Sequence, residues 1–201
     1  MVATELEVAN LALGMINLLP LASFADPTLQ AAQMSRIFAE SRDQVLREHA
    51  WNFAHRIDAL DDDATIDAGP YGFVYAYELP SDCIRIHKVC SEGDFNTGHR
   101  YSILQVTVGL TTELRLFADI GDAYARYTIR TEDVTLWDPL FVRALAAYLA
   151  FQMSSMQGHP DLQNNMYNLY LAAIASARAI DAGEQQTQQS EIVNPYVSER
   201  E

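Results

Sequence analysis

The stretch Tyr71-Gly72-Phe73-Val74-Tyr75-Ala76-Tyr77-Glu78-Leu79 decides the fold class, because a large apolar side chain stands at every second position. This two-residue period is typical of a β-strand with one buried face. Pro80 closes the strand, since proline cannot donate to a sheet ladder. The aromatic stripe predicts a sheet face packed against helices rather than a binding platform.

The next part of the chain has the same character. We expect further strands over residues 84–89, 101–108, 113–117 and 124–129, separated by turn signals such as Glu92-Gly93-Asp94. Connections this short favour an antiparallel sheet or a small sandwich over a parallel sheet.

Helical patterns precede this β-rich region. Thr4 and Glu7 have the spacing of a capping box, which predicts a helix from Glu5 that Pro20 ends. Asp26-Pro27 combines a capping residue with a proline at the first helical position, so a second helix is predicted from about residue 27 to about residue 50.

Helical patterns also follow the β-rich region. Asp138-Pro139 repeats the same start signal, and Gly158 is a plausible C-terminal cap for that helix. Pro160 opens the next helix, which is expected to end near Gly183.

The predicted fold class is α+β: an antiparallel helical bundle of about four helices, an inserted small antiparallel β domain and a flexible C-terminal tail. The predicted domains are residues 1–60 with 137–183 (helical), 61–136 (β-rich insertion) and 184–201 (tail). The tail is polar and low in complexity. It contains a short apolar island that either orders on a partner or does nothing, and from it we take Ile192, Val193, Pro195 and Tyr196 as candidate partner contacts.

Composition excludes some classes of function. The chain has 201 residues, with 13 Lys+Arg against 27 Asp+Glu and a net charge of −14. Such a charge argues against a general surface for gripping nucleic acid, because that affinity comes from Lys and Arg. Without a signal-peptide pattern or a membrane-spanning apolar run, a soluble protein made inside the cell is expected. Cys83 and Cys90 are expected to be free thiols.

Motifs for catalysis or metal binding are missing from the sequence. It contains no Gly-rich phosphate loop, no Gly-x-Ser-x-Gly elbow and no Cys-x-x-Cys pair. The run Asp61-Asp62-Asp63 lacks the glycine and glutamate of a calcium loop, so we interpret it as a solvated loop. No catalytic, cofactor-binding or metal-ligating residue is assigned. A pair of carboxylates for glycoside hydrolysis stays open, because separation in space decides it.

Conspicuous aromatic and basic residues receive structural interpretations. Trp51, Phe53 and Trp137 stand at the junctions of helical and β-rich regions, where core packing is more plausible than stacking on a ligand. Several arginines give the middle region local positive charge, and we expect them to be exposed and to pair with the excess acid. They are Arg56, Arg85, Arg115, Arg126 and Arg130.

Four stretches, taken in order, resemble the tail tubular protein A and head-to-tail adaptor family of short-tailed bacteriophages. They are Ala9-Asn10-Leu11-Ala12-Leu13-Gly14-Met15-Ile16, Arg42 to Ala54 with Trp51-Asn52-Phe53-Ala54, Tyr77-Glu78-Leu79-Pro80-Ser81-Asp82-Cys83-Ile84-Arg85-Ile86, and Leu136-Trp137-Asp138-Pro139-Leu140-Phe141 with the helix after it. Ala50 departs from the family, where a proline often precedes the tryptophan. The residues that carry the motif are Trp51, Phe53, Leu79, Pro80, Asp82, Arg85, Trp137 and Pro139.

The resemblance implies a structural virion protein without enzymatic activity or cofactor. Its subunits would form a ring, typically of twelve, between the portal protein and the tail nozzle protein of the phage neck. Double-stranded DNA would pass through the channel without specific binding. Two alternatives are another phage neck or head-completion protein and, from a different class, a virion-associated peptidoglycan hydrolase that uses paired carboxylates.

Overall fold

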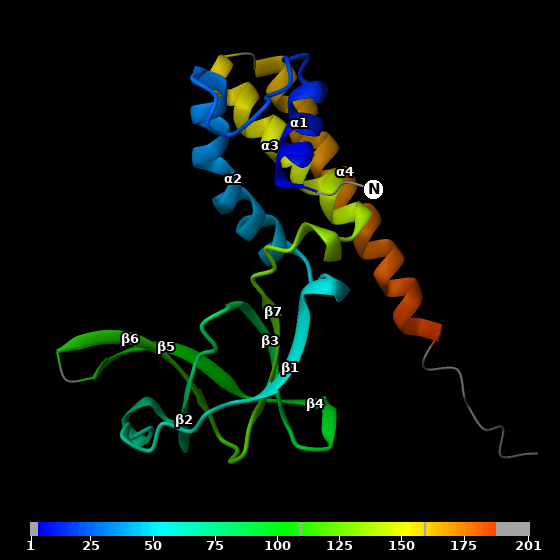
Figure 1. Cartoon of the computed structure of the whole chain (residues 1–201). Helices are drawn as coiled ribbons and strands as arrows, with labels where there is room; N and C mark the ends of the chain where they lie inside the picture. The colour runs from blue at the N-terminus through cyan, green and yellow to red at the C-terminus, as the bar shows by residue number, and fades with distance from the viewer. Residues whose placement is uncertain (1–3, 109, 159, 188–201) are drawn as a thin grey trace, which may run out of the picture. The chain divides into compact units, whose positions relative to one another are not determined.

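The structure, a computed structural model, describes residues 4–108, 110–158 and 160–187. It divides into a helical unit, Met1–Phe38 with Asp138–Glu201, and a β unit, Ala39–Trp137. Figure 1 shows the helices near the two ends of the chain and the strands in its middle. Helix α2 (Leu29–Glu48) begins in the helical unit and ends in the β unit.

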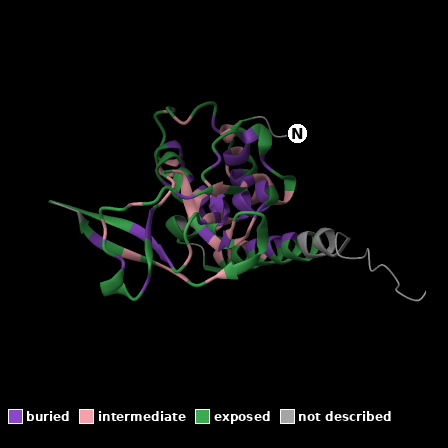
Figure 2. Cartoon of the chain, turned by 90° about the horizontal axis from the view of Figure 1, so that it is seen from below, coloured by how far each residue is buried: buried purple, intermediate pink, exposed green. Residues whose placement is uncertain are grey.

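In the helical unit, α3 (Pro139–Gln157) packs against both α1 (Glu5–Met15) and α4 (Pro160–Thr187). A run of small side chains makes α3 the centre of this unit, because alanines let neighbouring helices approach closely. The fully buried residues of α3 include Ala144, Leu145, Ala146, Ala147, Leu149 and Ala150. Figure 2 colours buried residues purple and exposed residues green; most of the described side chains of α4 are exposed or half-buried.

The predicted helix signals are confirmed in most places. The Thr4 side chain accepts from the Glu7 amide while the Glu7 carboxylate accepts from the Thr4 amide, which is the capping box. Asp138 caps α3, and Gly158, with a φ of +73°, closes it. Three ends were predicted wrongly: α1 stops at Met15, before Pro20, and α4 continues past Gly183 to Thr187. The third is the start of α2 at Leu29, where Thr28 and not Asp26 accepts from the first turn.

The β unit contains two antiparallel sheets. The four-stranded sheet has the order β1-β7-β3-β4 and the three-stranded sheet the order β2-β6-β5. The strands are β1 (His55–Ala59), β2 (Tyr75–Glu78), β3 (Cys83–Ser91), β4 (Asp94–His99), β5 (Tyr101–Val108), β6 (Thr111–Ala118) and β7 (Tyr124–Ile129). Three short 3-10 turns accompany them: Asn52–Ala54, Gly69–Tyr71 and Val134–Leu136.

The core of the β unit lies where side chains from the two sheets meet. One buried cluster joins Ile86, Val89 and Tyr127 of the four-stranded sheet to Tyr77 and Leu116 of the three-stranded sheet. A second, smaller cluster covers the other face of the three-stranded sheet and is built from Ala68, Phe73, Ala76, Val106 and Phe117. The prediction of antiparallel pairing is confirmed.

The predicted fold class is nevertheless wrong. Over its described residues the chain is α+β, with four α-helices and two antiparallel sheets of seven strands in all, and it is not a helical bundle with a small inserted β domain. The strands dominate the middle of the chain and form their own two-cluster core, so they are no minor insertion. Moreover, the last part of α2 belongs to the β unit and is therefore not a member of a bundle.

The aromatic stripe that predicted one long strand is divided in the structure. Tyr71 lies in a 3-10 turn, and only Tyr75–Glu78 is a strand. Phe73 and Tyr77 enter different clusters of the β unit, so the stripe does not form one face against helices. Strands β1 and β4 were not predicted. No helix within the described residues is both long and apolar enough to span a membrane.

Candidate functional site

The two tryptophans are structural, as predicted. Trp51 is 2% exposed and Trp137 is 6% exposed. Each indole N–H donates to a backbone carbonyl six residues earlier: Trp51 to Val45 at 2.9 Å and Trp137 to Thr131 at 3.1 Å. Neither ring is therefore available as a stacking platform for a ligand.

The other motif residues have varied positions. The Phe53 ring lies 6.3 Å from the Trp51 ring, Asp82 accepts from Arg56, and Pro139 is the first residue of α3. Leu79 and Pro80 line a pocket, and Arg85 lies on an exposed sheet face, both described below. The candidate partner contacts Ile192, Val193, Pro195 and Tyr196 lie outside the described residues.

The acidic run does not form a wholly solvated loop, which corrects its interpretation. Asp63 is mostly buried and accepts from Arg115 Nε at 2.9 Å. Hydrogen bonds from Thr65 and Arg115 hold the pKa of Asp63 below its usual range. Glu113 also pairs with Arg115, at 2.8 Å. Arg115 is thus a buried structural cation rather than an exposed one.

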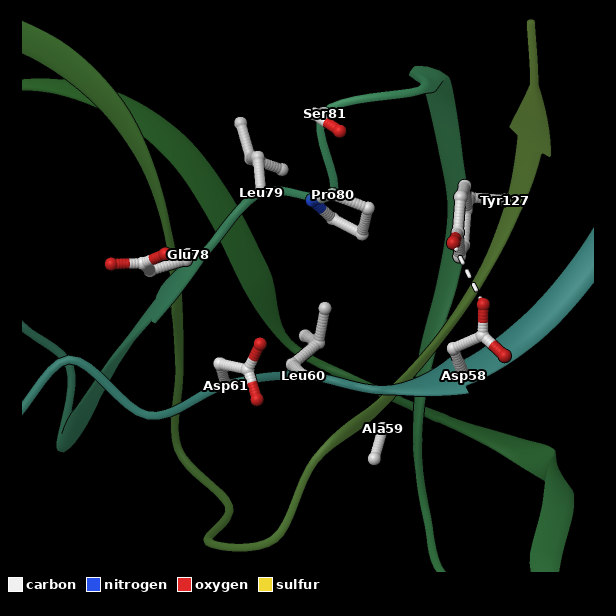
Figure 3. A pocket seen from close by; sticks show the side chains of 9 residues that line it. All are labelled: Asp58, Ala59, Leu60, Asp61, Glu78, Leu79, Pro80, Ser81 and Tyr127. Carbon is white, nitrogen blue, oxygen red and sulfur yellow. Dashed lines mark hydrogen bonds between the residues drawn. The ribbon is translucent and has the colours of Figure 1, made fainter.

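A pocket of about 340 Å³ opens beside the ends of β1 and β2, and we call it the acidic pocket (Figure 3). Asp58 and Tyr127 lie at one end of it, Asp61 and Glu78 at the other, with Leu60 and Pro80 between them. The complete lining is Asp58, Ala59, Leu60, Asp61, Glu78, Leu79, Pro80, Ser81 and Tyr127. Two of its carboxylates lie near arginines outside the lining, Asp58 at 3.7 Å from Arg56 and Glu78 at 3.8 Å from Arg115.

Contacts within the β unit hold two carboxylates of the acidic pocket in place. The Tyr127 hydroxyl donates to Asp58 at 2.9 Å, and burial together with Asp58 raises the pKa of Tyr127 to about 12. Glu78 lies 3.8 Å from Arg115. Asp58 and Glu78 thus each have a partner within the β unit. Among the described residues, no group of His, Cys, Asp and Glu could hold a metal ion.

The opposite side of the four-stranded sheet is basic. Because side chains alternate along strands, His55 and Ile57 of β1 point away from Asp58, and Arg126 of β7 points away from Tyr127. Lys88 of β3 stands opposite Arg126 in the register of the adjacent strands β3 and β7. We call this side the basic face and define it as Arg47, His55, Arg85, His87, Lys88 and Arg126.

Hydrogen bonds hold the edges of the basic face in place. At the end of α2, Arg47 donates to the Ile84 carbonyl at 2.7 Å, and Arg85 donates back to the Arg47 carbonyl at 3.0 Å. Lys88 donates to the Asn96 carbonyl at 2.7 Å. These bonds use backbone acceptors, so they position the three cations without neutralising their charges.

Two neutral histidines lie at the centre of the basic face. Their rings are 5.5 Å apart; Arg126 Nε donates to His55 Nε2 at 2.9 Å, and His87 Nε2 is 2.7 Å from the Thr128 hydroxyl. Burial and Arg126 lower the pKa of His55. Burial lowers the pKa of His87 to about 4, and the neighbouring basic side chains add to this effect. These groups are His55, Arg85, Arg126 and His49.

The cations of the basic face differ from the other cations of the β unit. Arg42, Arg56, Arg100, Arg115 and Arg130 each form an ion pair with a carboxylate. Over the described part of the chain, Arg47, Arg85, Lys88 and Arg126 form none. The expectation of ordinary pairing with the excess acid is therefore wrong for Arg85 and Arg126.

Sequence reasoning missed the basic face because it placed residues 51–60 in the helical domain. The alternation His55-Arg56-Ile57-Asp58 was the available signal for β1. Strand β3 has irregularities in its register with β7, and these decide on which side of the sheet His87 lies. Such irregularities have no clear sequence signature.

Comparison with known proteins adds no identification. No family model matches the chain, and no curated protein sequence matches it.

Proposed function

We propose that this chain is a structural subunit of a head-to-tail adaptor, forming a ring between the portal and the tail nozzle of a short-tailed bacteriophage. The sequence resemblance supplies this setting, and DNA would pass through the ring without specific binding. The protein would belong to the neck of the virion after its synthesis in the host cytoplasm. It would act through surfaces and not through catalysis.

The observation that carries the proposal is the apolar stripe on the β5–β6 hairpin. Ile103 faces Leu116 across the two strands, and Leu114 lies two residues further towards the turn on the same side. Leu116 is fully buried, whereas Ile103 is 39% exposed and Leu114 is 55% exposed. Leu110, in the turn of the hairpin, is fully exposed.

This stripe continues from the core into solvent. Figure 1 shows the hairpin extending away from the other strands of the β unit, and Figure 2 shows its outer part as exposed. Exposed apolar surface that continues a buried face is typical of a protein contact. We assign the hairpin to a contact with the next component of the neck.

The test is to mix the purified chain with portal-bearing capsids and to count the bound subunits by electron microscopy. We expect a ring, with twelve copies as the resemblance implies. Leu110→Ser combined with Leu114→Thr should leave a folded protein that attaches much more weakly. Leu29→Ser is the matched control, because this side chain is 76% exposed on α2.

Three outcomes would count against the proposal. Failure of the wild-type chain to attach rejects the adaptor function. Attachment with a different stoichiometry supports the alternative of another neck or completion protein. Unchanged attachment of the hairpin variant removes the hairpin from the contact.

A further inference from the structure

A cluster of unpaired cations on the basic face is unexpected in a chain with a net charge of −14. Acidic residues outnumber basic ones, and most basic residues of the β unit have acidic partners. Chance alone would scatter unpaired cations over this surface. Instead Arg47, Arg85, Lys88 and Arg126 lie together, around two neutral histidines.

This arrangement has an electrostatic cost that an anion would remove. Arg126 lies beside both histidines, since its charge lowers the pKa of His55 and of His87. Like charges gathered on one surface repel one another. Asp94, at the start of β4, already accepts from the Asn96 and Thr97 amides.

The chain itself carries the complementary surface. The acidic pocket lies on the other side of the same sheet, since Asp58 and Tyr127 alternate with Ile57 and Arg126. Asp61 is exposed, and its carboxylate has no hydrogen-bond or ion-pair partner within the described residues. The β unit therefore presents unpaired cations on the basic face and one unpaired carboxylate, that of Asp61, at the acidic pocket.

We propose that the basic face binds the acidic pocket of a second copy of this chain, so that β units associate head to tail. Contact between two identical faces would oppose like charges, whereas contact between opposite faces pairs them. A pocket of about 340 Å³ is large enough to admit an arginine side chain. A head-to-tail contact closes into a ring when its rotation permits. The inference deepens the proposed function, on which it rests for its biological setting.

The first measurement is the sedimentation velocity of the full chain at concentrations up to about 1 mM, where contacts with millimolar Kd become visible. We expect the average mass to rise with concentration at about 20 mM NaCl and to fall towards the monomer at about 500 mM NaCl, because salt screens exposed charges. A protein that stays monomeric throughout overturns the proposal.

Charge reversal on each surface identifies the contact. Arg85→Glu with Lys88→Glu reverses the basic face, and Asp61→Lys with Ser81→Lys reverses the pocket. Each double variant should weaken association at least about tenfold. The pocket variant also makes each molecule less acidic. If overall charge alone controlled association, weaker repulsion between molecules would strengthen association instead of weakening it. Arg36→Glu with Arg143→Glu is the matched control for net charge, since both arginines are exposed in the helical unit.

Mixing the two reversed variants is the decisive step. Neither can pair with itself, but each surface of one is complementary to a surface of the other, so the mixture should associate as the wild type does. Association that persists in both variants alone, or a mixture that stays monomeric while both variants keep native circular dichroism, overturns the proposal. Binding of a short DNA duplex to the basic face without self-association also overturns it.

The outcomes separate this inference from the adaptor function. Self-association through these surfaces without attachment to portals would reject only the adaptor function. Attachment of the reversed variants to portals in full rings would reject only the proposed contact.

Discussion

At the scale of single residues, buried side chains with one well-defined hydrogen bond stabilise the β unit. Trp51 combines large buried apolar area with an indole N–H that donates to Val45. Trp137 repeats the arrangement with Thr131. The Trp51 indole thus bonds back to the last turn of α2, and the Trp137 indole to the segment after β7, which explains why aromatic residues stand at these junctions.

We predict that Trp51→Ala lowers the free energy of unfolding by about 3–5 kcal/mol, because it leaves a cavity and an unpaired carbonyl. Trp51→Phe keeps much of the packing and should cost less. Urea denaturation measures both. A loss of less than about 1 kcal/mol for the alanine variant would contradict a structural role.

We also predict that His87 makes stability depend on pH. Its pKa is about 4 in the folded protein, below the usual value of 6.5. Between these two values the unfolded chain binds a proton at His87 that the folded protein does not. The contribution of neutral His87 to the free energy of unfolding is therefore fully present above pH 6.5 and is lost as the pH falls towards 4. Because the ring is only half-buried, solvent screening reduces the effect to about 1–2 kcal/mol.

His87→Gln can keep a hydrogen bond to Thr128 but cannot titrate. Comparing urea denaturation of this variant and the wild type between pH 7 and pH 4 isolates the histidine from the carboxylates. The variant should lose less stability than the wild type. Parallel curves would show that His87 contributes nothing.

At the scale of elements, one buried ion-pair network ties the loop after β1 to the β5–β6 hairpin. Arg115 of β6 holds Asp63, while Glu113 and Glu78 complete its surroundings. The root of the hairpin is thereby anchored even though its outer part is exposed.

Arg115→Met should lower the free energy of unfolding by about 3–5 kcal/mol, because Asp63 remains buried without its cation. Adding Asp63→Asn should restore part of this loss, since no buried charge is then left unpaired. Losses that simply add in the double variant would contradict the coupling.

The elements also show where sequence reasoning works and where it fails. Capping signals at Thr4 and Asp138 located helix starts well, because they are local hydrogen bonds. The strand over 124–129 was predicted correctly. By contrast, β4 (Asp94–His99) has few apolar residues, and its pairing with β3 depends on distant contacts. The partners of Arg115 and the two sides of the four-stranded sheet likewise depend on tertiary packing.

At the scale of the whole molecule, each of the two units has its own buried interior. In the helical unit this interior centres on α3, and in the β unit it lies between the sheets. Units of this kind commonly open as separate cooperative blocks.

We predict that destabilisation stays within the unit where it is introduced. Leu145→Ala, at a fully buried position in α3, should speed hydrogen exchange of amides in α3 and α4 but not in β3 and β7. Trp51→Ala should do the reverse. Equal acceleration of exchange in both units by either variant would show that the chain unfolds as a single block.

Lys88 has a practical consequence, because it is the only lysine in the chain. Apart from the terminal amine, every amine-directed reagent would therefore modify the protein at one position, in the middle of the basic face. The rate of that modification would report directly whether this surface is covered. A fluorophore or cross-linker attached there needs no engineered residue, so occupancy of the face could be followed in an intact assembly.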